Sequence, residues 1–170
     1  MLRFARNDSL VAVIARSGAT KQSPDGTPPV IIIHSLAHAV AALSAAAEAG
    51  RAVILASAPD AGIYAGPGWF GALIAAARAT IPTAECAALL DCGDDAGAAQ
   101  AAIRAGIEGV VFTGRADVGE RLADIARQRD ARLLTARPVP ALDLETEFFA
   151  SPEILRRRCA DILATAVPFC

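Results

Sequence analysis

The chain has 170 residues, a formal net charge of −2 and a pI near 5.7. No basic field is therefore expected to attract the phosphates of a nucleic acid, and the aromatic content of 5% offers little surface for base stacking. No apolar run approaches the roughly 18 residues that span a membrane. Neither a nucleic acid nor a membrane is expected as a partner, and the length suits one domain.

The cysteines and the single lysine restrict the redox compartment and the catalytic mechanisms that the chain can use. Four cysteines stand at positions 86, 92, 159 and 170 without a CxxC pair, which is typical of a reduced, cytoplasmic chain. Lys21 is the only lysine and lies near the N-terminus. Schiff-base catalysis needs a lysine in a desolvated pocket, so a mechanism that forms a Schiff base on lysine is excluded for the rest of the chain.

Residues 1–28 differ in composition from the rest of the chain. They are basic and polar and end in the chain-breaking string Ser23-Pro-Asp-Gly-Thr-Pro-Pro29. Residues 14–23 also resemble translated repeats at the ends of bacterial reading frames. We expect a disordered or over-extended N-terminal arm over 1–28, followed by a single α/β domain over 29–170.

From Val30 onward, short apolar runs alternate with alanine-rich amphipathic segments. The runs predict buried strands at 30–33, 52–56, 86–90, 109–112 and 131–134, and the segments between them predict helices at 36–50, 69–79, 96–105 and 118–129. A linker follows Pro138 and Pro140, and a last helix is expected over 152–166. The pattern predicts a parallel sheet of about five βα units, either half of a TIM barrel or open and flavodoxin-like, plus a C-terminal helix.

Polar residues follow the predicted strands where a parallel sheet binds ligands, at its carboxyl ends. The ends of the first four predicted strands give the candidate site residues, which are His34, Ser57, Asp60, Asp91, Cys92, Asp94, Thr113 and Arg115. Loops at strand ends are polar in most proteins, so a purely structural role stays open for each of them.

Three segments resemble the class II (metal-dependent) fructose-bisphosphate aldolase family. They are residues 53–66, the string Leu89-Leu-Asp-Cys-Gly93, and residues 102–112. The resemblance covers roughly residues 30–135 and implies the first half of a TIM barrel. It places Asp91 where the family has an acid/base aspartate, and Cys92 where the family has a zinc-ligand histidine. The family's other zinc ligands and phosphate loops belong to later strands, which this chain lacks.

Several roles remain open for these residues. Zinc could be held by His34, Cys92 and either Asp91 or Asp94, although a partly buried histidine with ordinary hydrogen bonds is commoner. Asp91 is a candidate general base or, alternatively, an acceptor for loop amides. Asp94 could bind a ligand or cap the next helix. Arg115, beside Gly114, could pair with an anion or lie on the surface.

The leading functional hypothesis is an aldolase-related domain that binds a small anionic molecule and lacks the complete lyase machinery. One alternative is a metal-dependent lyase or isomerase acting on a phosphorylated or keto-sugar substrate. Another is a structural or regulatory subunit that completes its site with a partner chain. Because an open sheet exposes its edges, we also expect a homo-oligomer, formed through an edge, the Trp69 loop or the last helix.

Overall fold

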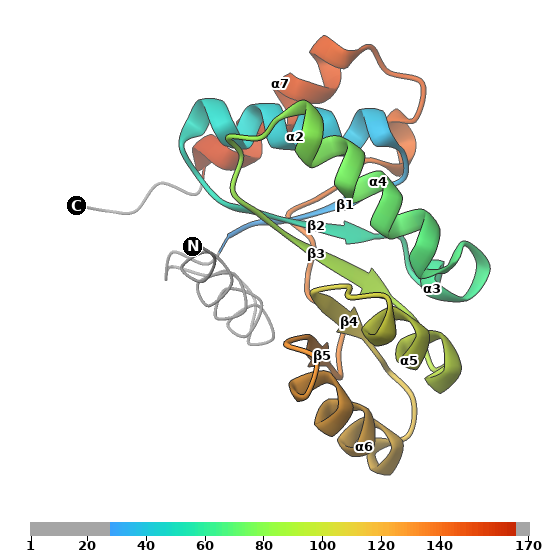
Figure 1. Ribbon diagram of the computed structural model, residues 1–170. Helices are drawn as coiled ribbons and strands as arrows, with labels where there is room; N and C mark the ends of the chain where they lie inside the picture. The colour runs from blue at the N-terminus through green and yellow to red at the C-terminus, as the bar shows by residue number, and fades with distance from the viewer. Residues whose placement is uncertain (1–27, 166–170) are drawn as a thin grey trace, which may run out of the picture.

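A computed structural model describes residues 28–165, and six parallel strands form its sheet (Figure 1). The strands are β1 (Val30–Ile33), β2 (Val53–Ser57), β3 (Cys86–Asp91), β4 (Gly109–Val111), β5 (Arg132–Leu134) and β6 (Leu142–Asp143), and they lie in the order β5-β4-β3-β2-β1-β6. The sheet is open, and β1 to β5 lie side by side in chain order, as consecutive strands do in a barrel. The predicted α/β class is confirmed.

Helices connect the strands and pack on one face of the sheet (Figure 1). They are α2 (Leu36–Ala49), α3 (Ala61–Tyr64), α4 (Gly66–Thr80), α5 (Ala96–Arg104) and α6 (Ala116–Arg127), followed by the short 3-10 helix η1 (Glu145–Glu147) and by α7 (Pro152–Thr165). None of the helices in the described range combines the length and apolar character that crossing a bilayer requires. The expected C-terminal helix is present and packs against α2.

The alternation of side chains along the strands gives the sheet two different faces. One face, with Ile31, Leu55 and Leu90, is buried under the helices and forms the main core. The other face carries a second apolar cluster that includes Ile54, Leu89 and Val111, and no described helix contributes to it. The candidate site lies on this helix-free face.

Residues 135–141, called the strap here, connect β5 at one edge of the sheet to β6 at the other. Three strap residues, Arg137, Pro138 and Pro140, line a cavity together with strand residues of the helix-free face. At its end, β6 pairs with β1, with Ile31 opposite Leu142 and Ile32 opposite Asp143. The strap therefore crosses the face that the helices leave uncovered.

The element boundaries agree with the sequence pattern, with two differences. The linker expected after Pro140 contains β6, because hydrogen bonds to the exposed edge of β1 make a strand of two residues that have no apolar pattern. The helix expected from Trp69 begins at Gly66 with Pro67 in its first turn, and the short α3 precedes it. The arm expected over 1–28 lies outside the described residues except for Pro28.

Candidate functional site

Asp91 is the centre of a charged network at the carboxyl end of β3. Its side chain is 8% exposed and faces the helix-free side of the sheet. Oδ1 accepts hydrogen bonds from the backbone N–H of Gly93 at 2.8 Å and of Asp60 at 3.1 Å. The Asp91 N–H in turn donates to Oγ of Ser57 at 2.9 Å. These bonds fix the loops after β2 and β3 relative to each other.

Arg137 of the strap supplies the positive charge of this network. Its Nε donates to Oδ2 of Asp91 at 2.6 Å, and its Nη2 donates to Oδ1 of Asp91 at 3.2 Å. Nη2 also reaches Oδ1 of Asp60 at 2.6 Å. Hydrogen bonding to Asp91 raises the pKa of Arg137 above its ordinary value. Within residues 28–165, Nη1 of Arg137 has no hydrogen-bond acceptor, so two of its five N–H groups remain available.

The backbone around the network adopts conformations that specific residues tolerate. Asp60 has φ 61°, in the left-handed region that aspartate occupies more readily than most side chains. Gly93 has φ 53°, and a Cβ at this position would overlap the Asp60 carboxylate. Both loops are therefore shaped to bring Asp60 and Asp91 to the same guanidinium.

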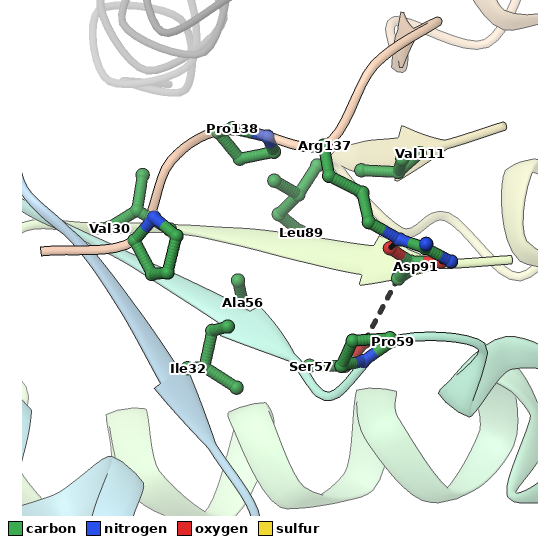
Figure 2. A pocket seen from close by; sticks show the side chains of 11 residues that line it. Val30, Ile32, Ala56, Ser57, Pro59, Leu89, Asp91, Val111, Arg137 and Pro138 are labelled. Atoms are coloured by element: carbon green, nitrogen blue, oxygen red, sulfur yellow. Dashed lines mark hydrogen bonds and ion pairs between the residues drawn. The ribbon is translucent and has the colours of Figure 1, made fainter. Parts of the chain in front are cut away.

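A cavity of about 230 Å³ lies between the strap and the helix-free face, with this network at one end (Figure 2). Apolar side chains make most of its wall, among them Ile32, Leu89 and Val111 from the strands and Pro138 from the strap. Ser57, Asp91 and Arg137 provide its polar end. A ligand that fits here has a small apolar body and one polar group.

Three of the predicted site residues, Ser57, Asp60 and Asp91, are brought together in this network. Asp91 accepts hydrogen bonds from loop amides, which was one of the two roles expected for it. Its carboxylate also accepts hydrogen bonds from Arg137. Its role as a general base stays a prediction. Arg137 was missed, because nothing in the string Arg137-Pro-Val-Pro140 distinguishes it from a surface linker.

Cys92 lies on the opposite side of the sheet from Asp91, because successive strand residues face opposite ways. Its thiol is fully buried in the main core beside the α3 residue Gly62. Burial, with a smaller contribution from Asp91, raises the pKa of the Cys92 thiol to about 12. The fold therefore does not bring the Cys92 thiol to the Asp91 network, and its metal-ligand role stays a prediction.

His34 is also placed away from the network. Its Nε2 lies 2.7 Å from Oδ1 of Asp143 on β6, and its backbone N–H donates to Nδ1 of His38. The zinc set of His34, Cys92 and Asp91 or Asp94 is thus not assembled. Among the residues that the structure describes, no three His, Cys, Asp or Glu side chains form a group that could hold a metal ion. The donors present do not fit the family's zinc.

The remaining candidates lie on exposed loops. Asp94 is exposed, and its neighbour Asp95 is the residue that caps α5, accepting from the N–H of Ala98 at 2.8 Å. Thr113 is exposed, and its backbone N–H donates to the Gly93 carbonyl. Arg115 has an 80% exposed side chain paired with Asp117. The geometry brings none of Asp94, Thr113 and Arg115 to the Asp91 network.

Comparison with known proteins supports the fold and goes no further. No protein-family profile and no curated protein matches the chain. Among solved structures, the chain is similar to a candidate fructose-1,6-bisphosphate aldolase from Coccidioides immitis, with 16% identity and a TM-score of 0.55. The match covers 78% of this chain and 46% of that one, so the chain spans less than half of the aldolase. The chain has an aldolase-like fold at this level of similarity.

Proposed function

We propose that this chain is an aldolase-related domain that binds a small monocarboxylate at Arg137 and lacks the complete lyase machinery. The observation that carries the proposal is a guanidinium with two unused N–H groups at the polar end of an apolar cavity. The polar end of the cavity lies at the carboxyl ends of β2 and β3, where parallel sheets bind ligands. Arginine recognises carboxylates through paired N–H groups of this kind.

The charges around Arg137 restrict the charge that a ligand can carry. Asp60 and Asp91 together with Arg137 carry a net charge of −1, which disfavours a bisphosphate or another multiply charged anion. The Asp60 side chain is 52% exposed, so an incoming carboxylate can replace it on Arg137 while Asp60 turns to water at small cost. Asp91 is buried and keeps the guanidinium in place.

The proposal predicts that benzoate binds with about tenfold higher affinity than its neutral counterpart benzamide. In Arg137→Gln this preference is expected to disappear, whereas Arg115→Gln, which removes an arginine paired elsewhere, should bind like the wild type. Asp60→Asn removes the competing carboxylate and should tighten benzoate binding severalfold. Isothermal titration calorimetry on the full chain measures all four.

Equal affinity for benzoate and benzamide in the wild type would contradict the proposal. Unchanged benzoate binding in Arg137→Gln would contradict it as well. The Asp60→Asn variant keeps the test decisive if Arg137→Gln proves unstable, because weaker benzoate binding there would show that Asp60 assists the ligand and does not compete with it.

A second candidate function is that of a subunit completing its site with a second copy of the chain. One observation favours it: the sheet is open, with β5 and β6 at its edges. We expect a homodimer in solution, because an open parallel sheet leaves both edge strands without partners. Light scattering at micromolar concentration should give twice 17.4 kDa, and a monomer mass throughout would contradict this hypothesis.

A further inference from the structure

A second cavity, of about 410 Å³, opens at the carboxyl ends of β1 and β2. Its wall combines His34 at the end of β1 with Tyr64, Trp69, Glu145 and Phe148 from the segments around it. The loop after β2 separates it from the Arg137 cavity, since Pro59 lines one and Ala58 and Ala61 line the other. Its volume is within the range of small-molecule sites.

His34 presents a fixed imidazole to this cavity. Oδ1 of Asp143 lies 2.7 Å from Nε2 of His34 and also accepts from the N–H of Glu145 at 3.0 Å. Because a carboxylate only accepts hydrogen bonds, the neutral ring carries its proton on Nε2, and Nδ1 is left as an acceptor. No hydrogen-bond donor in the described part of the chain reaches this Nδ1.

The charge at the cavity is negative. Among residues 28–165 no arginine lines it, and the chain's one lysine, Lys21, lies outside that range. The Glu145 carboxylate has no cationic or hydrogen-bonding partner within 28–165. Burial and the nearby carboxylates of Asp60 and Asp91 raise the pKa of Tyr64, which is consistent with a negative potential there.

The aromatic side chains also favour a positively charged ligand. Tyr64, Trp69 and Phe148 all line the cavity although each is at least 44% exposed. Aromatic faces attract ammonium groups through their quadrupole, and their rings also cover apolar surface of a ligand. Both the unpaired acceptors and the rings therefore favour a cation with N–H donors.

We propose that this second cavity binds a protonated primary amine with a small apolar body. The ammonium donates to the Glu145 carboxylate and to Nδ1 of His34, and the body packs against Tyr64, Trp69 and Phe148. Asp143 is a positioning residue that holds the imidazole in the required tautomer. This site is separate from the carboxylate site at Arg137, and neither proposal depends on the other.

The test uses the fluorescence of Trp69, which is the only tryptophan of the full chain and part of the cavity wall. Benzylamine, benzyl alcohol and benzoate share a ring and differ in charge, and each is titrated near neutral pH. Benzylamine is expected to give a saturable fluorescence change, with about tenfold weaker binding of benzyl alcohol. Absence of saturable benzylamine binding, or equal binding of the alcohol, would overturn the proposal.

Glu145→Gln identifies the group that recognises the charge. The exposed Glu145 can be replaced without disturbing the core, and the variant should bind benzylamine about tenfold more weakly while its affinity for benzyl alcohol stays the same. Glu153→Gln, an exposed glutamate in the first turn of α7, is the matched control and should behave like the wild type. If Glu145→Gln binds benzylamine with wild-type affinity, Glu145 does not recognise the ammonium group and the proposal is wrong.

Discussion

Replacing Arg137 by leucine is expected to lower the free energy of unfolding by about 2 kcal/mol. The substitution leaves the Asp91 side chain, 8% exposed, without its cation, and removing one partner of a buried ion pair leaves an uncompensated charge. The Arg137 side chain is 44% exposed, so solvent screening keeps the loss below that of a fully buried pair. Urea denaturation of both proteins measures the difference.

A double-mutant cycle distinguishes the ion pair from the packing of the arginine side chain. Asp91→Asn keeps the shape of residue 91 and removes its charge, so Arg137→Leu in that background should cost markedly less than in the wild type. Arg115→Leu is the matched control, because within the described range this exposed arginine pairs only with its near neighbour Asp117. If Arg137→Leu lowers the free energy of unfolding equally in the wild type and in Asp91→Asn, the ion pair contributes no coupling energy.

The Cys92 thiol is expected to react with a thiol reagent about a thousandfold more slowly than an exposed cysteine near neutral pH. The thiolate is the reactive form, and burial raises the pKa of this thiol to about 12 from an ordinary value near 9, which lowers the thiolate fraction by that factor. Its zero exposure lowers access as well. The rate of DTNB modification of native protein, in a background with both Cys86→Ser and Cys170→Ser, measures this reactivity.

Denaturation supplies the control for the Cys92 prediction. In urea all remaining thiols should react at the rate of a free cysteine, which shows that the native fold protects them. Cys159 is equally buried, and burial likewise raises its pKa to about 12, so the same slow rate is expected there. A thiol that titrates rapidly in the native protein near neutral pH would place Cys92 or Cys159 outside the core.

The strands and helices were predictable because their signals are local. An apolar run such as Val30-Ile-Ile-Ile33 and a glycine such as Gly50, which ends α2 with φ 60°, carry their structural meaning within a few residues. In contrast, β6 exists only because the edge of β1 pairs with it. A two-residue strand of this kind has no signal of its own.

The candidate site was predictable in part, for the same reason. The ends of β2 and β3 indicated Ser57, Asp60 and Asp91, since strand ends are visible in the apolar pattern. Arg137 reaches Asp91 through the course of the strap, and Asp143 reaches His34 through β6, so neither partner could be found from spacing. Cys92 directly follows β3, and the alternation of side chains along the chain places it in the main core, opposite Asp91.

The pairing of β6 with β1 also has a consequence for synthesis of the chain. Translation produces β1 among the first elements and β6 among the last, so one edge of β1 has no partner until residues 142 and 143 have left the ribosome. Arg137 precedes β6 by only a few residues, and the strap is held at both ends only when that pairing forms. Asp60 and Asp91 are therefore synthesised before the cation that pairs with them. The network of the two carboxylates and Arg137 can form only after the strap has been made.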